Sequence, residues 1–368
     1  MNTIETFVKR LLNVSCIVIC LLLFSCVDNP GNTNDDLVED IEQSAYVVCE
    51  GLFGQNNGTI SRVTLHDFSV INNFFSIVNK GFKIGDTPND LALHGKRIFV
   101  SVSGSNTLEQ FDALSGKSLS RLVFGNSKTP RKIVILNDST GFATCLNDDV
   151  IVEFNPQNMS MRSEWKTGPA PEGAAVVDGK IFCANSGYGV YRYKEALAGS
   201  ISVFDIYSKT AIGNIGGLPN VVDVAASSKR NTVFALYRHL SIFPDSLGGL
   251  VEIDANTLHI KKLWRVKTPI SLTIDKSENL LAFISDNSVF QLNLTDVDPT
   301  PEKLFSSSAF NLINGVTYNN NASQIWIANA KNFIVNGEIF VFDLTNRSIL
   351  NTIPVGLNPS RILFFNNN

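Results

Sequence analysis

The side chains that could do chemistry in this sequence are mostly aromatic, amide or cationic. They gather in four segments rich in Gly and Asn, at residues 51–58, 185–199, 237–249 and 329–337. Tyr offers a large contact surface with a polar tip, and Arg pairs with planar or anionic groups, so both are common at binding sites. Together with Arg131, these segments supply the ligand-binding residues that we predict: Phe53, Asn56, Asn57, Arg131, Tyr188, Tyr191, Arg192, Tyr193, Tyr237, Arg238, His239 and Phe333.

Catalytic and metal-binding patterns are scarce. The four histidines, His66, His94, His239 and His259, are far apart and form no paired metal-ligand spacing. There is no Gly-x-Ser-x-Gly elbow, Cys-x-x-Cys pair or phosphate-binding loop. The acidic residues at 296 and 298 lack the other ligands of a calcium loop, which favours a solvated turn. We therefore expect no catalytic residue, no bound metal and no cofactor.

The elements that must position these side chains are short strands in a repeat. Apolar runs alternate with turns of Gly, Asn and Ser, the pattern of antiparallel strands joined by tight turns. The unit restarts about every 40–50 residues, which is the length of a four-stranded propeller blade. The seven starts are at Pro88, Pro130, Pro171, Pro219, Pro269, near Asn314 and at Pro359.

The third strand of the unit ends in a recurring acidic residue. It is recognisable at 108–112, 201–205, 250–254 and 339–343, and it follows second strands such as 97–100 and 325–329. A short carboxylate at this position can bond nearby backbone N–H groups and cap the following turn. We therefore predict turn caps, rather than catalytic carboxylate pairs, for Asp112, Asp205, Asp254 and Asp343.

The two ends of the chain together supply one more blade. A single strand, at 360–365, follows the last start, whereas three strands, at 46–49, 59–64 and 70–77, precede the first full repeat. Pairing these four strands joins the chain ends and leaves no exposed sheet edge. The sequence thus predicts an all-β fold, a seven-bladed β-propeller of four-stranded antiparallel blades that is closed by its C-terminal strand.

The four long segments all join a second strand to a third strand. In a propeller, such loops emerge on the same face as the links between blades. Long loops on a rigid scaffold are where function concentrates. We therefore predict a binding face built by the seventh, third, fourth and sixth blades.

Residues 182–185, 326–329 and 356–359 resemble the YVTN-type repeat of surface-layer-like seven-bladed propellers. That repeat has a Tyr/Phe-Val-Ala/Thr-Asn second strand, an apolar third strand that ends in Asp, and a Gly-x-x-Pro link. The likeness covers about residues 45–365, and the sixth start departs from it with Asn314 in place of Pro. The segments 50–61, 85–87 and 130–131 are similar to a narrower group, the outer-membrane lipoprotein propellers of the Bacteroidetes type, some of which capture cobalamin.

Residues 1–25 resemble a lipoprotein signal peptide. Two basic residues precede an apolar run at 11–24 that is short for a membrane span. The run ends in a sequence that resembles a bacterial lipobox, so Cys26 is the predicted lipidation site. Residues 26–44 are rich in Asp, Asn and Glu and are predicted to be a flexible tether, with the propeller at 45–368. We expect an outer-membrane lipoprotein that faces either the cell surface or the periplasm.

Charge and cysteine usage limit the classes of partner. The formal net charge is −4 and the sequence has no Lys/Arg cluster, which argues against binding to nucleic acid. Three cysteines, Cys49, Cys145 and Cys183, fall in the second strands of different blades. Their dispersed positions favour buried thiols, with one disulfide left open as an alternative.

These observations favour a monomeric, non-enzymatic propeller that is anchored to the membrane by its lipid only and captures a ligand on the long-loop face. The narrower resemblance implies a corrinoid or another bulky nutrient, passed to an outer-membrane transporter. A protein-interaction scaffold at the cell envelope is one alternative. A lactonase- or hydrolase-like enzyme is another, because related propellers include enzymes. An enzyme would need acid–base side chains that converge on the central channel, which the sequence does not show.

Overall fold

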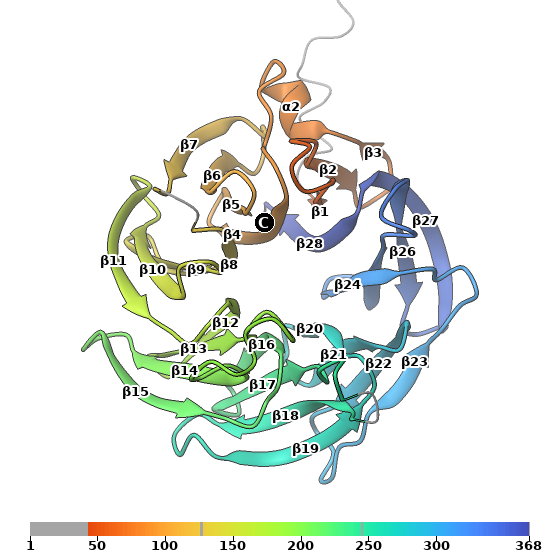
Figure 1. Ribbon diagram of the computed structural model, residues 1–368. Helices are drawn as coiled ribbons and strands as arrows, with labels where there is room; N and C mark the ends of the chain where they lie inside the picture. Colours follow the sequence, from red (N-terminus) through yellow and green to blue (C-terminus); the bar gives the residue numbers. More distant parts are fainter. Residues whose placement is uncertain (1–42, 126–127, 244–245, 368) are drawn as a thin grey trace, which may run out of the picture. The chain divides into compact units, whose positions relative to one another are not determined.

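The computed structural model describes residues 43–367, apart from 126–127 and 244–245. These residues form seven four-stranded antiparallel sheets arranged in a ring around a central channel, as Figure 1 shows. In each sheet the strand nearest the channel is followed by its neighbours in order toward the rim. The predicted all-β, seven-bladed propeller is therefore confirmed.

Six blades consist of four consecutive strands. Blade 1 contains β4 (Pro88–His94), β5 (Arg97–Val102), β6 (Thr107–Asp112) and β7 (Ser118–Val123), and blade 2 contains β8 (Pro130–Asn137), β9 (Thr140–Cys145), β10 (Val150–Asn155) and β11 (Ser160–Lys166). Blade 3 contains β12 (Pro171–Val177), β13 (Lys180–Asn185), β14 (Ser200–Asp205) and β15 (Thr210–Ile215). Blade 4 contains β16 (Val221–Ser227), β17 (Thr232–Tyr237), β18 (Gly248–Asp254) and β19 (Ile260–Val266). Blade 5 contains β20 (Ile270–Ile274), β21 (Leu280–Ser285), β22 (Ser288–Asn293) and β23 (Glu302–Phe305), and blade 6 contains β24 (Ile313–Asn319), β25 (Gln324–Asn329), β26 (Asn336–Asp343) and β27 (Ser348–Leu357).

Blade 7 joins the two ends of the described chain. Its strand order is β28 (Pro359–Asn366), β1 (Gln43–Cys49), β2 (Thr59–Thr64) and β3 (Val70–Ile71), with Tyr46 opposite Leu363 in the β1–β28 pair. This arrangement confirms the predicted closure. Strand β1 begins at Gln43, two residues before the expected propeller boundary, and residues 1–42, with the predicted signal peptide, Cys26 and most of the tether, lie outside the described residues.

The predicted strand at 70–77 is wrong in its second half. Only β3 pairs with β2, and the chain then turns at Asn73, which has a φ of 54°, into the short helix α2 (Phe74–Val78). Phe74 and Phe75 are buried in a cluster with Tyr46 and Phe111. The apolar residues of this run therefore pack onto blades 7 and 1 in helical form instead of extending the sheet.

The core lies between adjacent blades because second strands are buried on both faces. In β21 and β25, for example, every residue after the first is buried. Cys49, Cys145 and Cys183 belong to such strands, are buried and are free thiols. Burial raises the pKa of the Cys49 thiol to about 11 and of the Cys145 thiol to about 12, so both remain protonated at neutral pH.

The turn-capping prediction for the third strands agrees with the hydrogen bonds. Asp112 accepts a bond from the backbone N–H of Ser115 at 2.7 Å, and Asp205 accepts the equivalent bond from Ser208 at 2.7 Å. Asp254 and Asp343 each accept two backbone N–H bonds from the turn that follows. These bonds to the ionised form hold the pKa of Asp205 and Asp254 below the ordinary value.

Candidate functional site

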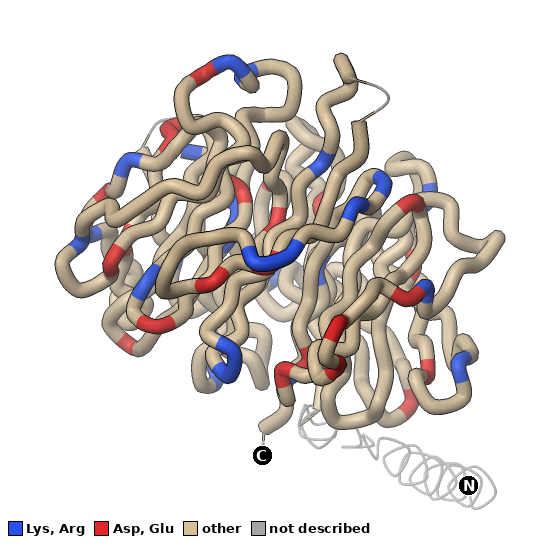
Figure 2. The backbone as a smooth tube through the Cα atoms, turned by 90° about the horizontal axis from the view of Figure 1, so that it is seen from below, with Lys and Arg blue, Asp and Glu red and all other residues tan. Residues whose placement is uncertain are grey.

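The four long loops emerge on one face of the ring. They join β1 to β2, β13 to β14, β17 to β18 and β25 to β26, which are second-to-third connections in blades 7, 3, 4 and 6. Figure 2 shows the ring from the side, with the C-terminus at one face and tall loops rising from the opposite face. Lys and Arg are interspersed with Asp and Glu in this view, without a surface of one sign. We call the side with the tall loops the long-loop face.

The innermost strand of every blade carries a register shift where it begins at the long-loop face. In blade 1 the shift lies between Pro88 and Asp90, and in blade 4 it lies between Val221 and Asp223. Equivalent shifts occur in the other five blades. A β-bulge leaves one residue outside the ladder and turns neighbouring side chains away from the regular alternation. The repeated bulge therefore directs the second and third residues of inner strands toward the channel.

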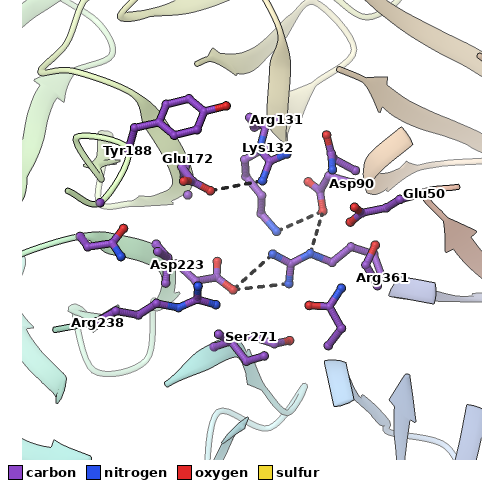
Figure 3. Close-up of a pocket in the computed structure, with 18 residues that line it drawn as sticks. Glu50, Asp90, Arg131, Lys132, Glu172, Tyr188, Asp223, Arg238, Ser271 and Arg361 are labelled. Atoms are coloured by element: carbon purple, nitrogen blue, oxygen red, sulfur yellow. Dashed lines mark hydrogen bonds and ion pairs between the residues drawn. The ribbon is translucent and has the colours of Figure 1, made fainter. Parts of the chain in front are cut away.

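The end of the channel at this face is a cavity of about 360 Å³, which we call the channel mouth. Figure 3 shows the charged side chains that line it, converging from several blades. Five blades contribute six charged side chains from the second or third residues of their inner strands, two of them from blade 2, and two of the long loops contribute one charged residue each. The charges balance as four carboxylates and four cations: Glu50, Asp90, Glu172 and Asp223, with Arg131, Lys132, Arg238 and Arg361.

Arg361 spans the channel mouth between two buried carboxylates. Its Nη1 and Nη2 atoms lie 3.4 Å from Oδ2 of Asp223 on blade 4, and its Nε lies 3.9 Å from Oδ1 of Asp90 on blade 1. Burial alone would lower the pKa of Arg361, but the carboxylates of Asp223 and Asp90 together raise it above the ordinary value. This cross-channel bridge is drawn with dashed lines in Figure 3.

The two bridged carboxylates are also bonded to neighbouring strands. Asp90 accepts from the backbone N–H of Ile133 at 2.9 Å and lies 3.3 Å from Nζ of Lys132. Asp223 accepts from the backbone N–H of Leu272 at 3.1 Å. Both carboxylates thus join the inner strand of their own blade to that of the next blade. Their oxygens are already bonded or ion-paired within the protein.

Arg238 has a different environment from the other cations of the channel mouth. Its Nε donates to the carbonyl oxygen of Pro269 at 3.2 Å, and no carboxylate of the described residues lies within ion-pair distance of it. The carboxylate whose charge raises the pKa of Arg238 is Glu172, which itself pairs with Arg131 at 3.3 Å. Burial lowers the pKa of Arg238, and the charge of Glu172 offsets only part of that effect. The guanidinium points into the cavity in Figure 3.

A second cavity, of about 580 Å³, adjoins the channel mouth between blades 3, 4, 5 and 6. We call it the apolar groove, because Val190, Leu240, Ile270, Ile284 and Ile313 contribute much of its lining. The channel mouth and the apolar groove share part of their lining: Tyr188, Gly189, Asn220, Arg238 and Ile270. A polar, charged cavity therefore adjoins an apolar one on the long-loop face.

The structure brings together five of the twelve residues predicted to bind a ligand. Arg131, Tyr188 and Arg238 line the channel mouth, and Tyr191 and His239 join Tyr188 and Arg238 in the apolar groove. Tyr193 lies beside a smaller cavity of about 200 Å³.

The other six predicted residues do not line the channel mouth or the apolar groove. Arg192 forms a bidentate pair with Asp149 and a further pair with Glu195, so its charge is used within the protein. Tyr237 is buried in the core, and its hydroxyl accepts a bond from Arg265. The remaining four lie on the loops of blades 7 and 6: Phe53, Asn56, Asn57 and Phe333.

Sequence reasoning missed most of the charged side chains of the channel mouth. It expected no convergence of acid–base groups on the channel, whereas the structure places Asp90, Lys132, Glu172, Asp223 and Arg361 there. All five occupy the second or third position of an inner strand, so counting from each blade start would have found most of them. Asp223 departs from this count, because β16 begins at Val221, two residues after the predicted start of the fourth blade at Pro219.

Two further features of the described residues bear on function. They contain no cluster of three or more His, Cys, Asp or Glu side chains that could hold a metal ion. No helix among them is long and apolar enough to cross a membrane.

Comparison with known proteins places the chain by fold. A structure of hydrazine synthase from Kuenenia stuttgartiensis is similar with a TM-score of 0.64 and 12% sequence identity, over 74% of this chain and 88% of that one. The WD40 repeats of RRP9 have a TM-score of 0.55 and 11% identity, over 74% and 81% of the two chains, and the WD40 domain of Neurospora crassa Pan2 has 0.53 and 12%, over 75% and 80%. No family model and no curated protein matches the chain. Identities this low show the β-propeller fold alone.

Proposed function

We propose that this protein is a non-enzymatic binding protein that captures a ligand at the channel mouth and the adjoining apolar groove. The observation that carries the proposal is that these two cavities lie side by side on the long-loop face and share five lining residues. Cavities of about 300–1,000 Å³ that combine apolar walls with a few fixed polar groups are typical of small-molecule sites. Most of the channel-mouth charges are held in place by ion pairs or backbone bonds, so the site is largely formed before a ligand arrives.

The pairing of the carboxylates favours binding over catalysis. Asp90 and Asp223 already accept bonds from backbone N–H groups and from cations. A general base needs an oxygen available to the substrate proton, and a nucleophile needs a neighbouring base. Neither arrangement is built around these two carboxylates, which act instead as connections between blades.

A corrinoid is the first ligand to test, because the sequence resembles lipoprotein propellers that capture cobalamin. Such a molecule is bulkier than the channel mouth, so one edge would enter the cavity while the long loops contact its periphery. Isothermal titration of the purified protein with cyanocobalamin should give saturable binding. No heat of binding at high micromolar concentrations would remove the corrinoid from consideration and leave smaller ligands to be tested.

A role as a protein-interaction scaffold is the second candidate, and the exposed tips of the long loops favour it. Phe53 is 80% exposed, Tyr191 is 84% exposed and Ile334 is 75% exposed. Aromatic and apolar residues at loop tips are typical anchors of protein interfaces. An outer-membrane transporter that receives the captured ligand would fit both candidates, with lipidation at Cys26 holding the propeller at the membrane.

A further inference from the structure

Arg238 is a cation that has no carboxylate partner among the described residues. The other three cations of the channel mouth each have a carboxylate partner: Arg131 pairs with Glu172, Lys132 with Asp90, and Arg361 with Asp223. Arg238 is anchored through Nε to the carbonyl oxygen of Pro269, which leaves the outer nitrogens of its guanidinium directed at the cavity. An anchored guanidinium is well suited to bind a carboxylate through two parallel hydrogen bonds.

The position of Arg238 links this free charge to an apolar surface. Its side chain lines both the channel mouth and the apolar groove. The acidic residue of the groove, Asp286, pairs with Lys267 at 3.3 Å and so offers no partner to Arg238. The groove therefore presents apolar walls with, at its inner end, one positive charge that forms no ion pair with a described residue.

We propose that the ligand captured at this site is an apolar molecule with a single anionic group, such as a carboxylate, which binds Arg238 while the body of the molecule occupies the apolar groove. This inference rests on the proposed function and specifies its ligand class. The volume of about 580 Å³ accommodates a ring system or a branched chain of drug-like size. Burial of the apolar body supplies most of the affinity, and Arg238 supplies the preference for the anion.

The preference can be measured with a matched pair of fluorescent probes. Pyrenebutyrate carries a carboxylate, and pyrenebutanol has a hydroxyl in its place on the same chain and ring system. We expect the protein to bind pyrenebutyrate at least about tenfold more tightly than pyrenebutanol, a difference of about 1.4 kcal/mol, because only pyrenebutyrate can form charge-assisted hydrogen bonds with Arg238. The dissociation constants are obtained by titration of pyrene fluorescence at fixed ionic strength.

Two variants separate the charge from the apolar surface. Arg238→Gln should weaken pyrenebutyrate binding about tenfold or more and leave pyrenebutanol binding unchanged. Val190→Ser, in the wall of the groove, should weaken both probes by a similar factor. Lys83→Gln is the charge-matched control, because Lys83 is an exposed cation near Asn56 of the blade 7 loop, which is not part of either cavity. It should change neither constant.

The outcomes distinguish this inference from the proposed function. Equal binding of the two probes to the native protein, or a preference for pyrenebutyrate that survives in Arg238→Gln, would overturn the assignment of an anionic ligand. If neither probe binds but cyanocobalamin does, the ligand class is wrong and the binding function stands. If neither probe nor cyanocobalamin binds, both the anionic ligand class and the proposed binding function are overturned. The melting temperature of each variant is compared with that of the native protein, and equal values are the control that the fold is intact.

Discussion

The two arginines Arg192 and Arg238, both near the binding site, differ in whether they form an ion pair within the protein. Arg192, which the sequence predicted as a ligand contact, instead holds the β13–β14 loop to blade 2 through Asp149, with both Nη–Oδ distances at 2.7 Å. This pair fixes the loop that carries Tyr188 and Tyr191 over the two cavities. Arg238 has no such partner among the described residues. At the scale of the residue, Arg192 is paired within the protein and positions the loop, whereas Arg238 is available to bind a ligand.

The Asp149–Arg192 pair predicts a pH-dependent part of stability. Burial of Asp149 opposes ionisation, but the bonds from Arg192 and from the backbone N–H of Ala170 hold the pKa of this carboxyl below the ordinary value. Because the pKa is lower in the folded state, the ionised carboxyl contributes stability that is fully present above the unfolded pKa of about 3.9. This stability is lost as the pH falls through the folded pKa. We expect Asp149→Asn to cost about 1–2 kcal/mol at pH 7 and clearly less at pH 3.

Urea unfolding of the native protein and of Asp149→Asn at the two pH values measures this difference. Asp296→Asn is the control, since Asp296 is an exposed carboxylate whose one acceptor bond within the described part of the chain comes from the side chain of Asn293. Its cost should be near zero at both pH values. An equal cost for Asp149→Asn at pH 7 and pH 3 would show that the ion pair does not stabilise the loop.

The inner strands illustrate why the elements were easier to predict than the site. Turn residues and apolar runs are local signals, so the number of blades and their starts, to within two residues, could be predicted from the sequence, and so could the closing strand. The register shifts at the start of each inner strand could not, because a bulge depends on how the strand pairs with its neighbour. The six charged residues that the inner strands contribute to the channel mouth lie at those bulges. Helix α2 was missed for a similar reason, since its apolar residues are equally suited to a strand.

The inner strands also predict the effect of a small substitution. Gly315 occupies the third position of β24, where other blades have Asp90, Lys132 or Arg361, and a Cβ there would overlap the carbonyl oxygen of Ser360 on β28. Relief of that overlap would require blades 6 and 7 to separate. We expect Gly315→Ala to destabilise the protein by about 3 kcal/mol or more, the upper range for an overpacked site.

Thermal unfolding of Gly315→Ala, next to a control glycine, tests this. A Cβ added at Gly216 would meet no heavy atom within 4 Å, and this residue lies in the link after β15. Gly216→Ala should therefore change stability by less than about 1 kcal/mol. A Gly315→Ala protein with the melting temperature of the native form would mean that the inner strands of blades 6 and 7 are not in close contact.

At the scale of the whole molecule, β28 has two functions that depend on closure of the ring. It completes blade 7 by pairing with β1, and it carries Arg361 into the channel mouth, where the guanidinium connects blade 7 to the carboxylates of blades 1 and 4. The apolar run at 362–365 is typical of a strand that is buried on both faces. Ile362 and Phe365 are indeed buried, whereas Leu363 and Phe364 are half-buried. The closing strand is thus part of the scaffold and of the binding site.

Truncation after Asn358 should therefore abolish both stability and binding. The deletion removes two large buried apolar side chains, Ile362 and Phe365, worth about 1.5–3 kcal/mol each, against a typical domain stability of about 5–15 kcal/mol. It also exposes the edge of β1, which can then pair with other chains. We expect an aggregating protein by size-exclusion chromatography, with a lowered melting temperature in any soluble fraction. Removal of Asn367 and Asn368 alone, which lie beyond β28, should change neither property. A truncated protein that stays monomeric with the native melting temperature would show that the ring does not depend on its closing strand.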